Sequence, residues 1–445
     1  MRERAGCRPE WGILLALGGC LVAGPVWGDG LAELRALVEQ QSREIRTLRD
    51  EVRKLKDESR DGIPPEVVRT IDQRIIDFEN HPTSKLLVSG YGAAGYVDSD
   101  DADGSFGMLF VPIFHYQLSE RLHLTGELEF DLRGEESEVG VEYAQIDFLV
   151  NDHLTVSAGK FLLPFNAFGP RIHPSWINKL PSLPPIYGRH GARGGIIPVL
   201  SDTGINLSGG ARLPLLLGDW EPHVNYALYL VNGPRMEVEP ELDERFAELA
   251  GFLEGEGVVR SADDLLEALE IGHGEGTEIE FGETLRDNNG NKTVGGRIGL
   301  LPLRRLEVGG SFLRGAFDRD GDLDFRLLGF DGSYKVGPFD LRAEYIRLVY
   351  DLAGGGRERI DGYYAQGALK LRETLAHFGL RSGTFLDQLE LVLRYGKVNN
   401  RGDDREWTPG VVYWIRPSVP LKLAYAFRSG ARQDDELQLQ LAFGF

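Results

Sequence analysis

The segment between residues 163 and 201 is basic and holds no carboxylate at all. If such a segment lies in a water-filled passage with low-dielectric walls, its charge attracts anions and raises their local concentration. Its seven prolines would stiffen its path. We therefore predict that five of its side chains form an anion-attracting constriction: Arg171, His173, Lys179, Arg189 and Arg193. The alternative is that these bases rest on acidic residues of the surrounding wall and hold the segment in place.

The rest of the chain is strongly acidic, which makes this segment unusual. Among 445 residues there are 69 acidic and 49 basic side chains, a formal net charge of -20. A net charge of this sign argues against a nucleic-acid partner. The only two cysteines, Cys7 and Cys20, fall within the first twenty residues, so a disulfide scaffold is excluded.

Catalytic and metal-binding patterns are poorly represented. His173 and Ser175 lie two residues apart, but no G-x-S-x-G or H-E-x-x-H pattern accompanies them. The acidic clusters around residues 98–103 and 318–324 lack the closing Glu of a calcium loop. We predict no enzymatic activity, no metal site and no cofactor.

The elements that must position the basic segment are strands, because from residue 85 onward the side chains alternate between apolar and polar. At the C-terminus, for example, Leu437, Leu439 and Leu441 alternate with glutamines. Sixteen such strands are predicted near residues 86–97, 105–118, 121–133, 138–150, 153–162, 202–212, 222–231, 293–302, 305–316, 325–336, 338–351, 360–373, 386–398, 407–416, 419–428 and 435–445. Their usual length of 9 to 13 residues is enough for a tilted strand to cross a bilayer.

The connections between these strands alternate between short and long. Residues 119–120 and 151–152 are tight turns, whereas 163–201 and 232–292 are the longest connections. This asymmetry is typical of outer-membrane barrels. The sequence therefore predicts an all-β fold, a 16-stranded antiparallel transmembrane β-barrel over residues 85–445, acting as a passive channel for small hydrophilic solutes.

The alternation also predicts which charged residues face the lumen. Six are singled out: Arg342, Arg372, Arg394, Lys422, Glu127 and Glu129. Further carboxylates on the same face include Glu307, Glu344 and Glu390. Because both signs occur, this set does not determine the sign of ion selectivity.

The residues before the barrel predict export and oligomerisation. Residues 1–28 have the basic start, apolar stretch and small-residue end of a signal peptide, with acylation of Cys20 as the alternative. Residues 29–60 carry a heptad repeat from Leu31 to Leu55 and predict a periplasmic coiled coil, with a lone amphipathic helix as the alternative. Residues 61–84 form a linker with a short helix. The protein is thus expected in the outer membrane of a Gram-negative-type bacterium.

Several short motifs resemble the phosphate-selective porin O and P family. They are GKFLLPF at 159–165, YALYLVNGP at 226–234, DLRAEY at 340–345 and the terminal Phe445. The resemblance implies sixteen strands, a homotrimer, anion-attracting lumen residues and recognition of Phe445 by the barrel-assembly machinery. The constriction segment departs from the family in offering a single lysine, Lys179, so arginines would have to substitute. The heptad itself suits a dimer as well as a trimer.

A rival prediction is a plugged structural or adhesive barrel. Its external partner would bind the connection 232–292, which carries 17 acidic and 5 basic residues. The same acidic connections could contact lipopolysaccharide phosphates through divalent cations, so outer-membrane lipid and lipopolysaccharide are predicted partners in either case.

Overall fold

The computed structural model describes residues 85–100, 102–132, 137–188, 195–214, 220–237, 278–281, 289–377, 385–399, 403–430 and 433–445. The chain divides into two units, 1–83 and 84–445, and all described residues belong to the second. The predicted signal peptide (1–28), coiled coil (29–60) and linker (61–84) lie outside the described residues.

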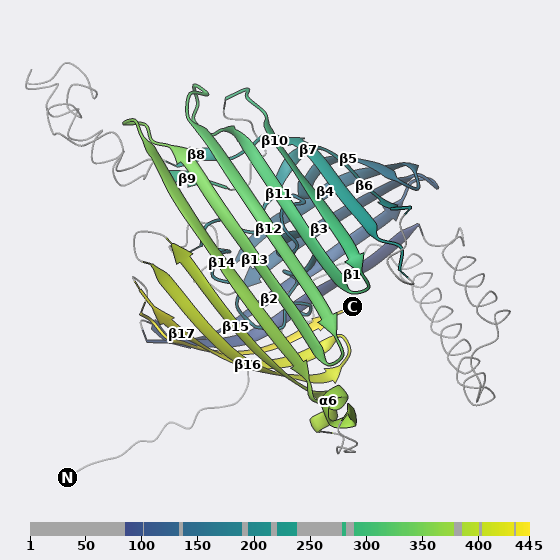
Figure 1. The fold of residues 1–445 in the computed structure, drawn as a ribbon, viewed down its shortest axis with the longest axis vertical. Coiled ribbons are helices and arrows are strands. Elements are labelled where there is room, and N and C mark those ends of the chain that lie inside the picture. The colour runs from purple at the N-terminus through teal and green to yellow at the C-terminus, as the bar shows by residue number, and fades with distance from the viewer. Residues whose placement is uncertain are drawn as a thin grey trace, which may run out of the picture. The chain divides into compact units, whose positions relative to one another are not determined.

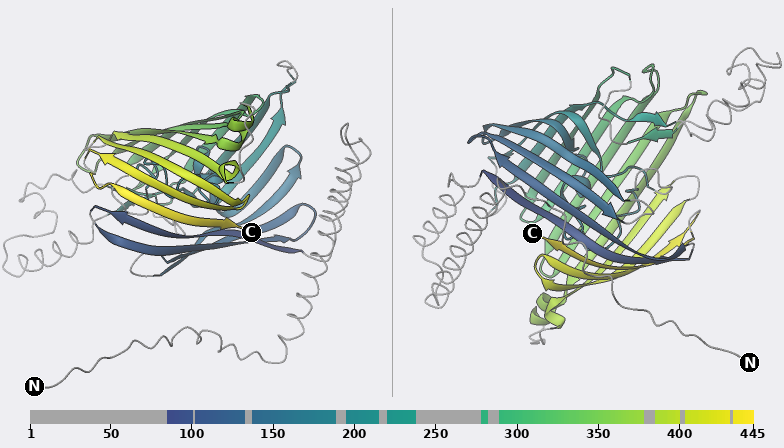
Figure 2. Two further views of the ribbon diagram at one scale, coloured as in Figure 1. Left: turned by 90° about the horizontal axis from the view of Figure 1, so that it is seen from below. Right: turned by 180° about the vertical axis from the view of Figure 1, so that it is seen from behind.

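Sixteen antiparallel strands form a closed barrel, which confirms the predicted fold class. They are β1 (Leu86–Ser99), β2 (Ala102–Gln117), β3 (Leu122–Leu132), β4 (Glu138–Asn151), β5 (Leu154–Leu162), β6 (Ser201–Arg212), β7 (His223–Val231), β10 (Thr293–Leu303), β11 (Leu306–Ala316), β12 (Asp324–Val336), β13 (Phe339–Asp351), β14 (Arg357–Lys370), β15 (Leu389–Asn399), β16 (Asp404–Arg416), β17 (Val419–Ser429) and β18 (Glu436–Gly444). The first strand pairs with the last, as the neighbouring purple and yellow strands of Figure 2 show. Closure leaves no unpaired strand edge, which a bilayer would not tolerate.

The alternation of the sequence sets the two faces of this sheet. On β18, Leu437, Leu439 and Leu441 are about 40% exposed on the outer surface, whereas Gln438 is 3% exposed on the inner face. The pairing register carries the same division around the ring, because directly paired residues point to the same face. The barrel is thus mainly apolar outside, and its inner face carries polar side chains together with the apolar ones on which a connection packs.

Short turns gather at one end of the barrel and long connections at the other. The short-turn end includes one larger connection, which contains helix α6 (Leu371–His377) and a 3-10 turn, η1 (Leu386–Gln388). The long-connection end carries a separate hairpin of β8 (Arg235–Glu237) and β9 (Glu278–Glu280). Figure 1 shows α6 below the barrel and this hairpin near its upper end. No helix within the described ranges is long and apolar enough to span a membrane.

The described residues of the third long connection, 163–188 and 195–200, fold into the barrel. Their side chains reach Gly92 on β1 and Glu307 on β11, strands that lie eight places apart in the sixteen-stranded ring. The connection includes one short helix, α3 (Phe168–Arg171), and its apolar residues pack against inward-facing aromatic and aliphatic side chains of β5 to β15. The connection therefore crosses the interior and is seated mainly on one side of it.

Candidate functional site

A buried carboxylate anchors the start of the third connection. Glu344, on the inner face of β13, accepts hydrogen bonds from the amides of Ala167 (3.1 Å) and Phe168 (2.8 Å) and from the Tyr187 hydroxyl (2.6 Å). The two amides are among those that the first turn of α3 leaves unpaired. Asn166 precedes these two residues and has a left-handed φ of 53°. Its backbone N–H donates a hydrogen bond to Ser311 Oγ at 2.9 Å. Glu344 thus joins the start of the connection and its later residue Tyr187 to one strand.

Arg171 is part of a charge cluster on the wall. Its guanidinium donates two hydrogen bonds to Glu307, both at 2.9 Å, in the planar geometry that favours arginine–carboxylate pairs. Arg297 of β10 shares Glu307 at 3.0 Å and bonds Asp331 of β12 at 2.7 Å. Two arginines therefore face two carboxylates, and the Arg171 side chain, although 44% exposed, carries little uncompensated charge.

Lys179 is buried and paired. Its ammonium bonds Glu390 on β15 and lies 3.6 Å from Asp340 on β13. The other oxygen of Glu390 accepts a hydrogen bond from Trp414 Nε1 at 3.0 Å. Because the Lys179 side chain is only 8% exposed, it is a structural contact of the connection with the wall. A passing anion would first have to displace a carboxylate.

His173 adds no positive charge at neutral pH, because burial lowers its pKa to about 4. Its Nδ1 bonds the carbonyl of Gly169, and its Nε2 lies 3.4 Å from the Tyr91 hydroxyl, which donates to Glu127 at 3.0 Å. Ser175 Oγ donates to the Gly92 carbonyl at 3.4 Å. Both side chains are thus engaged with the backbone, which is a structural arrangement.

Arg189 and Arg193 lie outside the described residues, so the structure places three of the five predicted constriction residues. It does not bring those three together. Arg171 sits at β11, Lys179 at β13 and β15, and His173 at β1.

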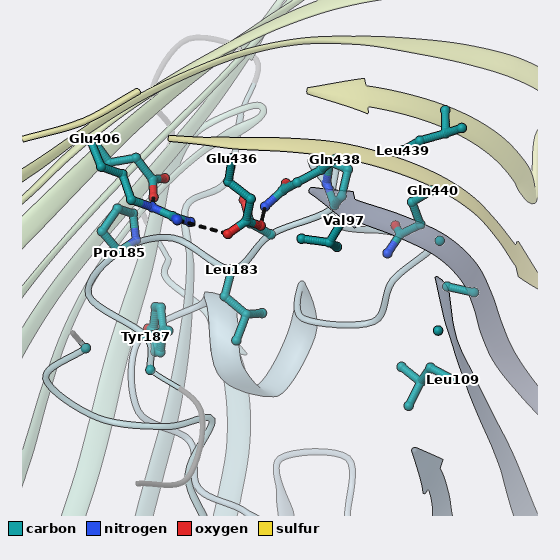
Figure 3. Close-up of a pocket in the computed structure, with 18 of the residues that line it drawn as sticks. Val97, Leu109, Leu183, Pro185, Tyr187, Glu406, Glu436, Gln438, Leu439 and Gln440 are labelled. Atoms are coloured by element: carbon teal, nitrogen blue, oxygen red, sulfur yellow. Dashed lines mark hydrogen bonds and ion pairs between the residues drawn. The ribbon is translucent and has the colours of Figure 1, made fainter. Parts of the chain in front are cut away.

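A pocket of about 450 Å³ lies between the third connection and the wall, toward the long-connection end. Its wall side carries Glu406 and Glu436, and its other side is formed by Leu183, Pro185 and Tyr187 (Figure 3). Arg428 bonds both carboxylates, at 3.0 Å and 2.9 Å. Gln438 Oε1, at the same wall, has no hydrogen-bond partner among the described residues and is a polar point for water or solute.

The register places five of the six predicted lumen residues on the inner face. Arg342 and Arg394 are both paired in register with Gln366, and Lys422 is paired with Gln440. Lys422 also bonds the Ser175 carbonyl, and Arg394 bonds Ser182 Oγ at 2.6 Å, so both hold the third connection. Glu127 and Glu129 belong to the inward positions of β3.

The assignment of Arg372 to a lumen-facing strand position is wrong. β14 ends at Lys370, and Arg372 belongs to helix α6 at the short-turn end. The predicted strand, residues 360–373, extended three residues beyond the end of β14 into this helix. Conversely, the sequence did not single out Arg297 or Asp331, although both occupy inward positions that the alternation could have identified.

Comparison with known proteins supplies no family. No family model and no characterised protein matches the sequence. Similar solved structures include an anion-selective porin from Comamonas acidovorans (12% identity, TM-score 0.49, 81% of this chain and 99% of that chain). Others are Salmonella typhi OmpF in complex with daunomycin (12%, 0.48, 81% and 97%) and the outer membrane channel DcaP of Acinetobacter baumannii (11%, 0.46, 81% and 97%). At these identities and TM-scores the likeness assigns neither solute nor activity, and the resemblance to the phosphate-selective family stays a prediction.

Proposed function

We propose that this chain is an outer-membrane porin, a passive water-filled channel for small hydrophilic solutes. The observation that carries the proposal is the crossing of a closed, apolar-outside barrel by the third connection, which leaves beside it a pocket with charged and amide side chains on the barrel wall. A polar interior on an apolar exterior is the arrangement of a channel in a bilayer. Solutes would move down their gradients with no bond made or broken.

Planar-bilayer recording of the purified, folded protein tests this proposal. The channel predicts discrete conductance steps in KCl. A well-folded oligomer that gave none would refute it. A matched variant, Leu183→Trp, places a larger side chain in the pocket and is expected to reduce the unit conductance without changing the fold.

We propose that anion selectivity, including any preference for phosphate, depends on Arg189 and Arg193. Arg171 and Lys179 are compensated by carboxylates, and His173 is neutral at pH 7. The reversal potential in a tenfold KCl gradient is the measurement. Arg189→Glu/Arg193→Glu should reverse an anion preference, and Arg171→Gln should leave it nearly unchanged. A cation preference in the parent would contradict the proposal.

The remaining partners are proposals of the same kind. Phe445 is 53% exposed, and its backbone pairs with Gly90 in both directions at 3.0 Å, so the terminal aromatic ring is presented at the barrel surface. That presentation supports recognition by the barrel-assembly machinery. A homotrimer, supported by a periplasmic coiled coil from Leu31 to Leu55, is tested by native gels of a chain lacking residues 31–55.

One observation favours a second candidate, a plugged barrel that binds an external partner through residues 232–292. The apolar cluster around Phe165, Phe168 and Phe325 fills one side of the interior with buried side chains. A plugged barrel predicts no current in the parent and current after removal of the third connection. Conductance in the parent would exclude it.

A further inference from the structure

The outer surface of β11 to β14 carries arginines where the rest of the described outer face is mainly apolar. Four of them form the outer arginine row, one on each strand: Arg314, Arg326, Arg347 and Arg359. The register and the burial of neighbouring residues show that these arginine side chains point outward. Arg326 lies two residues from outward Leu328 (44% exposed), and inward neighbours such as Phe325 are fully buried.

Two members of the row form no ion pair within 4 Å in the described part of the chain. Arg314 and Arg359 bond Asp324 (3.4 Å) and Asp361 (3.0 Å). Arg326 and Arg347 form no ion pair within the described residues, and Arg347 Nε is buried without a hydrogen-bond partner. Nearby carboxylates are Asp351, which interacts electrostatically with Arg326, and Asp361, the register partner of Arg347 that Arg359 already bonds. Moreover, Arg314 and Arg326 are directly opposed in register, where like charges repel. An anion outside the barrel would relieve both features.

The height of the row on the barrel identifies the kind of anion. Outward aromatic side chains form a continuous band across β12 to β16, with Phe330, Tyr345, Tyr363, Tyr395 and Trp407 in contact or paired in register. Such bands mark the edge of the hydrocarbon layer. Arg347 lies two residues beyond Tyr345, toward the long-connection end, and its guanidinium is 5.6 Å from that ring. The row therefore stands at the level of the lipid headgroups of the outer leaflet.

The opposite part of the outer face provides the contrast. At the same end of β1, β2 and β3, the surface is an apolar pocket lined by Tyr96, Phe106, Met108 and Leu132. The exposed carboxylate there, Asp98, has the opposite sign. The outer arginine row thus lies on one arc, the green strands that cross the front of Figure 1.

We propose that the outer arginine row binds the phosphate groups of a phosphorylated glycolipid in the outer leaflet, with Arg326 and Arg347 as the main contacts. Guanidinium groups suit phosphate because their donors match its oxygens in pairs. This inference rests on the outer-membrane location proposed above. It is independent of which solute passes through the lumen.

The test uses the purified full chain in detergent, titrated with diphosphoryl lipid A and followed by native mass spectrometry. We expect Arg326→Gln/Arg347→Gln to weaken binding by about tenfold or more. The matched control is Arg405→Gln, an outward arginine already held by Asp403 at 2.8 Å, which should bind like the parent. Arg326→Lys/Arg347→Lys preserves charge and should recover part of the affinity, which guards against a variant that misfolds.

Two results would overturn the proposal. One is equal affinity of the parent and the glutamine variant. The other is displacement of the lipid by inorganic phosphate at equal concentration, which would make soluble phosphate the ligand. Conductance is recorded on the same preparations. Conductance without arginine-dependent lipid binding would refute only the lipid-binding proposal. Lipid binding without conductance would refute only the proposal of a channel.

Discussion

Two sets of basic residues in this molecule differ in how their charge is used. Inside the barrel, the described bases of the third connection, Arg171 and Lys179, are matched to wall carboxylates. Outside, Arg326 and Arg347 form no ion pair in the described residues. The described bases of a positively charged segment can therefore contribute little net field, while arginines on neighbouring strands create an exposed cationic surface. Pairing, more than charge count, decides where an anion is attracted.

Among the paired bases inside the barrel, the largest loss of stability is expected when the Glu390 carboxylate is removed. Glu390→Leu leaves the Lys179 ammonium buried with only Asp340 nearby, at 3.6 Å. Breaking a buried pair on one side costs about 3–5 kcal/mol, and Asp340 places the expected loss near the lower value. Urea unfolding in lipid vesicles measures it.

The double variant Lys179→Met/Glu390→Leu sharpens this result. Replacing both charges by apolar side chains should restore most of the lost stability, because no uncompensated charge is left. If the double variant were as unstable as Glu390→Leu alone, Lys179 would not be the partner that matters, and this pair would not be a structural contact between the third connection and the wall.

A pH titration tests the seating of His173. Its pKa is about 4 in the folded protein and about 6.5 when unfolded, so the unfolded chain binds more protons between these values. Stability should therefore fall as the pH drops from 6.5 to 4, by up to about 3 kcal/mol. Since carboxylates also titrate, the measured quantity is the difference between the parent and His173→Gln. No difference between their pH profiles would contradict a buried neutral imidazole.

The sequence could predict the barrel because its signals repeat sixteen times. Each strand repeats the same alternation, and a local error such as Arg372 changes one boundary without altering the closed ring. The side of each lumen residue follows from the same pattern, as the pairing of Arg394 with Gln366 shows.

The site was harder to predict because its contacts join residues far apart in the chain. Lys179 meets Glu390 and Ala167 meets Glu344, contacts that span 211 and 177 residues. No periodicity encodes which carboxylate a loop base will find. The burial that neutralises His173 likewise depends on how the third connection folds back onto β1.

A smaller effect is expected for Arg171→Gln. Glu307 keeps Arg297 as a partner at 3.0 Å, and the Arg171 side chain is 44% exposed, so solvent screens much of its interaction. We expect a loss of about 1 kcal/mol in unfolding free energy. The single-channel reversal potential should stay within error of the parent. A clear shift toward cations would show that Arg171 contributes to the field in the lumen despite its pairing.

The smallest effect is expected on the outer surface in detergent, for Arg314→Gln. Its ion pair with Asp324 is long, at 3.4 Å, and both side chains are largely exposed, at 59% and 43%. Exposed pairs contribute about 0.2–1 kcal/mol, and relief of the repulsion from Arg326 offsets part of that loss. Thermal unfolding in detergent should therefore barely change. In vesicles containing diphosphoryl lipid A the same substitution should become more destabilising, because the bound phosphate would lose one of its cations. If Arg314→Gln lowered the stability equally in detergent and in these vesicles, the outer arginines would not depend on the lipid for their counter-charge. They would then not differ in this respect from the paired bases inside the barrel.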